Sequence, residues 1–218
     1  AREDGLISTT SEHYTPELER QLHLFHSRYI FRKGLEDLVD WPPGSFTEGG
    51  QGERDNHEMC AVNTVVNAFH HRALALMSRI AQALGREEDR ARFARRADLV
   101  RATVNRLLYD RARGVYVDGE GSSHSALHAN MFPLAFGLVP PEHVDSVVRH
   151  IESRGMACSV YGAQYLLEAL YAAGEAEYAL SLMTSDSKRS CSTEIGIEYA
   201  PEPKRVQSMR SSSPVSRS

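Results

Sequence analysis

Residues 61–84, AVNTVVNAFHHRALALMSRIAQAL, carry large apolar side chains at intervals of three and four residues. That spacing predicts an α-helix with one apolar face, ended by the glycine at position 85. The side chains expected to face inward are Val62, Val65, Val66, Phe69, Ala73, Leu76, Met77, Ile80 and Leu84. Residues 87–109 keep the same rhythm on a strongly charged helix. Because one glycine joins the two stretches, we expect an antiparallel helical hairpin.

The rest of the chain extends this pattern in both directions. Further helices are predicted over residues 16–39, 125–136, 140–155, 160–173 and 175–183, with long loops at 40–58 and 113–124 and a short strand at 115–117. Hairpins separated by long polar loops predict an all-α fold, a partial (α/α)6 toroid of antiparallel helical hairpins. The expected organisation is an irregular stretch at 1–15, the toroid domain at 16–186, and a disordered tail at 187–218 with few bulky apolar residues.

Composition limits the classes of protein to consider. A length of 218 residues, 41% hydrophobic content and a net charge of -4 fit one globular domain or a large fragment of one. The mild acidity argues against a nucleic-acid partner, and no apolar run is long enough to span a membrane. With no apolar leader and three scattered cysteines, Cys60, Cys158 and Cys191, we expect reduced thiols and a cytoplasmic location.

The loop at 40–58 concentrates the acids and contains the chain's single tryptophan, Trp41, next to Asp40. A glycosidase needs two carboxyl groups beside the scissile bond, and an aromatic ring matches the apolar face of a pyranose. Glu53 and Asp55 are the nearest carboxylates that chemistry alone would nominate as catalytic. The alternative is a solvated acidic loop in which Trp41 closes the edge of the core, because exposed acids are common.

Two other segments carry polar groups where helices are expected to begin. His124 and His128 are four residues apart, but no third ligand accompanies them, so we expect neither a metal nor a cofactor. His128 and Asn130 are better suited to bind sugar hydroxyls, with a hydrogen-bonded core histidine as the alternative. Tyr161 either faces a pocket or packs in the core. The segments at 70–71 and 90–101 are interpreted as helix surface.

Four segments, taken in order, resemble a known family. They are 38–44 (LVDWPPG), 62–69 (VNTVVNAF), 116–140 (YVDGEGSSHSALHANMFPLAFGLVP) and 154–171 (RGMACSVYGAQYLLEALY). Together they resemble the six-hairpin catalytic domain of bacterial α-L-rhamnosidases, over about residues 35–186. The resemblance implies a carbohydrate partner, namely a rhamnosyl glycoside, and sugar contacts at the matching positions Asp40, Trp41, His128, Asn130 and Tyr161.

The resemblance also implies a reaction, the hydrolysis of terminal α-L-rhamnosyl bonds with inversion. One glutamic acid would protonate the leaving oxygen and a second would activate water, with the two carboxyl groups about 6.5–9.5 Å apart. Residues 1–39 contain no match to the family's general-acid motif, and the match ends near Ser190, before the general base. A shifted reading frame or an incomplete gene would explain both departures.

Two consequences and two alternatives follow from an incomplete toroid. Missing hairpins would leave apolar helix faces uncovered, so we expect self-association, and weak activity if a catalytic glutamate is lacking. One alternative is a non-catalytic helical scaffold that binds a partner protein through a concave apolar surface. The other is a different toroid enzyme, such as a sugar epimerase or an unsaturated-uronyl hydrolase, which would need cationic residues in its pocket.

Overall fold

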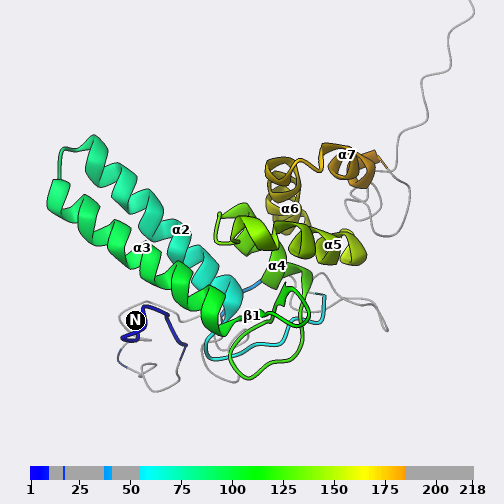
Figure 1. The fold of residues 1–218 in the computed structure, drawn as a ribbon, viewed down its shortest axis with the longest axis horizontal. Coiled ribbons are helices and arrows are strands. Elements are labelled where there is room, and N and C mark those ends of the chain that lie inside the picture. The colour runs from blue at the N-terminus through cyan, green and yellow to red at the C-terminus, as the bar shows by residue number, and fades with distance from the viewer. Residues whose placement is uncertain (10–16, 18–36, 41–54, 185–218) are drawn as a thin grey trace, which may run out of the picture.

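The computed structural model of the chain describes residues 1–9, 17, 37–40 and 55–184. These ranges contain helices and one short hairpin of strands (Figure 1). The helices are α2 (Thr64–Ala83), α3 (Glu87–Leu107), α4 (Leu127–Ala135), the 3-10 turn η3 (Pro141–His143), α5 (Val144–Arg154), α6 (Val160–Ala173) and α7 (Ala176–Thr184). The strands β1 (Tyr109–Asp110) and β2 (Val115–Tyr116) pair antiparallel, with Tyr109 opposite Tyr116.

The helix boundaries follow local chemistry. The side chain of Asn63 accepts hydrogen bonds from the amides of Val65 and Val66, 2.9 and 3.3 Å away, and so caps α2. Ser159 caps α6 in the same way. Gly174 ends α6 at a φ of 91°, a left-handed conformation that a glycine adopts without strain. The predicted helix at 160–173 is therefore confirmed at both ends.

The helices form three consecutive hairpins within the described ranges, α2–α3, α4–α5 and α6–α7. Helix α4 packs against both α2 and α6, so α2, α4 and α6 form one row and their return helices lie outside it. In Figure 1 the long α2–α3 hairpin extends to the left, and α4 to α7 lie to its right, with α4 nearest its lower end. The core lies where these elements meet, around the fully buried Leu108, Tyr116, Met131 and Leu166.

The side chains predicted to face inward from 61–84 separate into two groups. Val62 and Val65 are buried as expected. Phe69, Leu76, Met77, Ile80 and Leu84 are instead exposed by between 37% and 68%. The spacing correctly identified an apolar face of α2, but no described residue covers most of that face.

Two smaller expectations also change. The pair at 70–71 was expected on the helix surface, yet His71 is buried and His70 is half-buried. Burial, followed by the charge of Arg101, lowers the pKa of His71. Cys158 is buried, as favoured for a small thiol. The predicted helix at 16–39 lies almost wholly outside the described residues, and the predicted tail at 187–218 lies wholly outside them. Residues 1–9 contain neither helix nor strand.

Candidate functional site

Three aspartates from three separate segments meet at the beginning of α4. The amide of Ala126 donates to Asp118 over 2.8 Å, and the amide of Leu127 donates to Asp55 over 2.7 Å. The Nε2 atom of His128 lies 2.8 Å from Asp40. Ala126 has no side chain that could cap the helix, so distant carboxylates satisfy its first amides, where the helix dipole favours negative charge. The segments before α2 and the loop before α4 are thereby joined at one end of the fold.

Asp40 connects α4 to α6. Besides His128, its carboxylate accepts a hydrogen bond from the amide of Ser159 over 2.8 Å, and another from the Ser159 hydroxyl. Burial alone would raise the pKa of Asp40, but the hydrogen bonds from His128 and Ser159 outweigh burial and hold that pKa below its usual value. Asp40 is therefore an ionised acceptor at neutral pH and is not suited to donate a proton.

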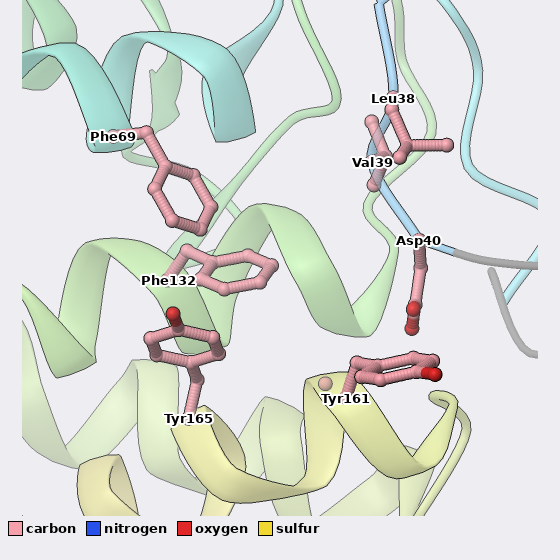
Figure 2. A pocket seen from close by; sticks show the side chains of 8 residues that line it. Leu38, Val39, Asp40, Phe69, Phe132, Tyr161 and Tyr165 are labelled. Atoms are coloured by element: carbon pink, nitrogen blue, oxygen red, sulfur yellow. The ribbon is translucent and has the colours of Figure 1, made fainter.

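A cavity of about 340 Å³ opens beside Asp40 (Figure 2). Its lining residues are Leu38, Val39, Asp40, Phe69, Phe132, Tyr161, Gly162 and Tyr165. Figure 2 shows Asp40 descending toward the Tyr161 ring, with Phe69, Phe132 and Tyr165 forming the opposite wall. The ring centroids of Phe132 lie 4.8 Å from Phe69 and 5.1 Å from Tyr165. This aromatic pocket, with one carboxylate on its lining, is the candidate site.

Gly162 allows the pocket to form. A Cβ atom at this position would lie 2.9 Å from the Oδ2 atom of Asp40 and 2.9 Å from the Cβ atom of Cys158. Any larger side chain would therefore push Asp40 away from the amide of Ser159. The glycine lets the first turn of α6 approach the carboxylate closely.

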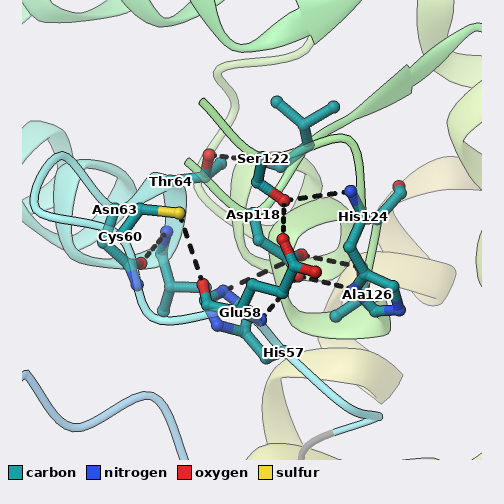
Figure 3. A network of polar contacts seen from close by, with 12 residues as sticks. His57, Glu58, Cys60, Asn63, Thr64, Asp118, Ser122, His124 and Ala126 are labelled. Atoms are coloured by element: carbon teal, nitrogen blue, oxygen red, sulfur yellow. Dashed lines mark hydrogen bonds and ion pairs between the residues drawn. The ribbon is translucent and has the colours of Figure 1, made fainter. Parts of the chain in front are cut away.

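Asp118 organises a second polar network on the same end of the fold (Figure 3). Its fully buried carboxylate accepts from the amide of Glu58 over 2.8 Å and lies 2.6 Å from Nδ1 of His124. Nε2 of His57 lies 3.9 Å from the other oxygen, and the His57 side chain is fully buried. Among the described residues, no group of three or more side chains is arranged to hold a metal ion. The network joins the loop before α2 to the loop before α4.

Asp55 and Asn130 occupy structural positions. The Arg154 guanidinium donates hydrogen bonds to both carboxylate oxygens of Asp55. This contact with Asp55 raises the pKa of Arg154. Asp55 itself is buried. Asn130 is fully buried and brackets Tyr116, accepting from its amide over 2.9 Å and donating to its carbonyl over 3.1 Å. Neither residue lines the pocket.

The structure brings some of the predicted site residues together. Asp40 and Tyr161 both line the pocket, and His128 binds Asp40 from behind. Tyr161 is 72% exposed, which excludes the core position considered for it. Trp41 and Glu53 lie outside the described residues. Sequence reasoning missed Phe132 and Tyr165, although Tyr165 follows Tyr161 by four positions and therefore shares its helix face.

Comparison with known proteins identifies the family. A sequence model of the bacterial α-L-rhamnosidase six-hairpin glycosidase domain matches residues 12–196. The chain belongs to this family. The crystal structure of the GH78 family rhamnosidase of Bacillus sp. GL1 is a structural neighbour, with a TM-score of 0.55 and 21% sequence identity. The match covers 83% of this chain and 16% of that rhamnosidase. A search of curated proteins found no match.

Membership in the six-hairpin family explains the arrangement of the described helices. The expected partial all-α toroid is confirmed, with α2–α3, α4–α5 and α6–α7 as consecutive hairpins of the family's domain. Within the described ranges, none of the helices combines the length and apolar character needed to cross a bilayer. Because the family is one of glycosidases, sugar cleavage is the first hypothesis to test for this pocket.

Proposed function

We propose that this chain forms the sugar-binding part of a glycoside hydrolase that acts on terminal α-L-rhamnosyl bonds with inversion. The observation that carries the proposal is the pocket in which Asp40 faces Tyr161, set in a domain of the α-L-rhamnosidase family. The support from the solved rhamnosidase concerns the fold, because 16% of that protein is matched.

The chemistry of the lining suits a deoxyhexose. Four aromatic rings, those of Phe69, Phe132, Tyr161 and Tyr165, offer apolar faces to C–H groups and to the C6 methyl group of rhamnose. Asp40 supplies a charged acceptor for a sugar hydroxyl on the pocket lining. The cavity of about 340 Å³ falls in the range of about 300–1,000 Å³ that is usual for small-molecule sites.

A uronyl substrate fits this lining poorly. Its carboxylate would meet Asp40, which is ionised, and the eight lining residues include no lysine, arginine or histidine. Like charges at short range disfavour binding. We therefore favour a neutral sugar over the uronyl alternative.

Hydrolysis needs a second carboxyl group that acts as an acid. Asp40 is held ionised, and Asp55 is engaged by Arg154. Of the two nominated carboxylates, Glu53 therefore remains the candidate for a catalytic role, and Trp41 remains a proposed sugar platform. His128 acts by orienting Asp40, and Asn130 holds the backbone of Tyr116. Binding should be easier to detect than turnover in this chain.

The test is a calorimetric titration of the chain with L-rhamnose, with D-galacturonate as the charged comparison. We expect rhamnose to bind and galacturonate not to bind. Tyr161→Ala should weaken rhamnose binding by about 2-fold to 13-fold, from the ~0.5–1.5 kcal/mol of an aromatic contact. Tyr171→Ala removes a tyrosine that is 52% exposed and lies on the same helix outside the pocket, and it should leave binding unchanged. Binding that is absent, or equal in both variants, would refute the proposal.

A further inference from the structure

Residues 2–9, which we call the strap, lie beside the lower end of the α2–α3 hairpin (Figure 1). Asn67 on α2 holds the backbone of Ile7 in both directions. Its Oδ1 atom accepts from the Ile7 amide over 2.8 Å, and its Nδ2 atom donates to the Ile7 carbonyl over 3.0 Å. On α3, the Thr103 hydroxyl donates to the carbonyl of Asp4 over 2.8 Å. The strap is therefore fixed to both helices of the hairpin.

Thr9, at the end of the strap, makes two hydrogen bonds. Its amide donates to the carbonyl of Ala61, just before α2, over 2.8 Å. Its hydroxyl donates to a carboxylate oxygen of Asp37 over 2.5 Å. A hydrogen bond to a carboxylate is stronger than one between neutral groups. Thr9 therefore ties Asp37, which follows it by 28 positions, to the beginning of α2.

Asp37 directly precedes the charged wall of the pocket. Leu38, Val39 and Asp40 all line the pocket, and Figure 2 shows them along one side of it, with Asp40 nearest Tyr161. Three residues span at most about 10 Å, so a shift of Asp37 is passed on to Asp40 with little slack. The far end of this wall is held by the hydrogen bonds to Asp40 described above. The wall therefore has a directional anchor at each end.

Burial does not replace these anchors. Leu6 of the strap is fully buried and Val39 is 6% exposed, so both contribute to the core. Apolar contacts are non-directional, and alone they would allow the wall to slide or turn. A hydrogen bond weakens steeply as its angle departs from linear. The bond between Thr9 and Asp37 therefore fixes the direction of the chain as well as its distance from the strap.

We infer that Thr9 is a positioning residue for the pocket. Its hydroxyl fixes Asp37 and thereby sets the place of Asp40 opposite Tyr161. The strap thus transmits the position of the α2–α3 hairpin to the carboxylate that we propose as the acceptor of a sugar hydroxyl. The effect on sugar affinity rests on the proposed function, whereas the effect on the place of Asp40 does not.

Hydrogen exchange of the Ser159 amide, followed by nuclear magnetic resonance, reports the place of Asp40 without any sugar, because that amide donates to Asp40. Thr9→Val removes the hydroxyl and keeps the branched shape. It should accelerate exchange at Ser159 by about 5-fold, the factor that corresponds to one ordinary hydrogen bond. The amide of Leu170, in the interior of α6, should exchange as in the wild type. Thr9→Ser keeps the hydroxyl and should restore the wild-type rate at Ser159.

Thr103→Val is the matched control. It also removes a threonine hydroxyl that is bound to the strap, but its partner is the carbonyl of Asp4. The backbone of Ile7 remains held by Asn67 in this variant, so Thr9 keeps its place. Exchange at Ser159 should therefore stay at the wild-type rate. A fast rate at Ser159 in Thr103→Val or in Thr9→Ser would overturn the inference.

Two further exchange results would also overturn it. Equal acceleration at Ser159 and Leu170 in Thr9→Val would show a general loss of stability. A wild-type rate at Ser159 in Thr9→Val would show that Asp40 keeps its place without the hydroxyl.

A calorimetric titration with L-rhamnose gives the functional readout. The affinity should fall by about 5-fold in Thr9→Val and stay unchanged in Thr9→Ser and Thr103→Val. An unchanged affinity in Thr9→Val, measured beside a wild type that binds, would overturn the inference. A wild-type chain that does not bind rhamnose would refute the proposed function instead, and the exchange rates at Ser159 would still decide the role of Thr9.

Discussion

Replacing Asp40 with alanine should destabilise the chain far more than replacing an exposed aspartate. Asp40 is 6% exposed and receives hydrogen bonds from His128, from the amide of Ser159 and from the Ser159 hydroxyl. The substitution removes the acceptor that holds α4 and α6 together. It should therefore lower the free energy of unfolding, and it should also open the pocket.

The magnitude follows from what each donor can do afterwards. The Ser159 hydroxyl already accepts from two amides of α6 and can keep that role, and His128 can change tautomer. The Ser159 amide has no such freedom and is left buried without an acceptor, a cost of about 1–3 kcal/mol. Adding the lost charged hydrogen bonds gives a total of about 3–5 kcal/mol, as found when a buried charged pair is broken. That is a large share of the ~5–15 kcal/mol that stabilises a typical domain.

Urea unfolding of the wild type, Asp40→Ala and Asp40→Asn measures this loss. Asp145→Ala, at an exposed position of α5, is the control and should change stability by less than about 0.5 kcal/mol. Because the folded pKa of Asp40 lies below the unfolded value of about 3.9, its contribution is complete above that pH and is lost as pH falls through the folded pKa. The difference in free energy of unfolding between wild type and Asp40→Asn should disappear below about pH 4. A change in Asp40→Ala no larger than in the control would refute the reasoning.

Three further changes test other contacts. Gly162→Ala should cost about 1–3 kcal/mol in thermal unfolding and weaken rhamnose binding, because its methyl group would crowd Asp40. Arg154→Met leaves the buried Asp55 carboxylate without its guanidinium and should cost about 3–5 kcal/mol in urea unfolding, a value near zero being incompatible with the ion pair. The free energy of unfolding should fall as pH drops from 7.5 to 5.5. Burial lowers the pKa of His71 in the folded chain, so the unfolded chain takes up the proton first. His71→Gln should flatten this dependence of the free energy of unfolding on pH.

Local sequence signals were sufficient for most of the helices. The spacing of apolar residues predicted α2 and α3, and glycine at position 174 marked the end of α6. A helix boundary depends on a few neighbouring residues, so these signals can be read from the sequence alone. The same spacing could not show whether a partner covers each face, as the exposed Ile80 demonstrates.

The candidate site was predicted in part. Asp40 and His128 were both nominated as sugar contacts, and the structure places them in one hydrogen bond across 88 positions of sequence. The role of Asp118 was missed, because its partners at Glu58 and Ala126 come from different loops and leave no spacing to recognise. Asp55 was chosen for its chemistry, but its ion pair with Arg154 spans 99 positions.

The most direct test of the account is a crystal structure of the chain with L-rhamnose. The account predicts the sugar in the pocket, with its C6 methyl group against the aromatic rings of Phe132 and Tyr165 and a hydroxyl bound to Asp40. A sugar bound elsewhere on the chain, with the space between Asp40 and Tyr161 empty, would contradict it.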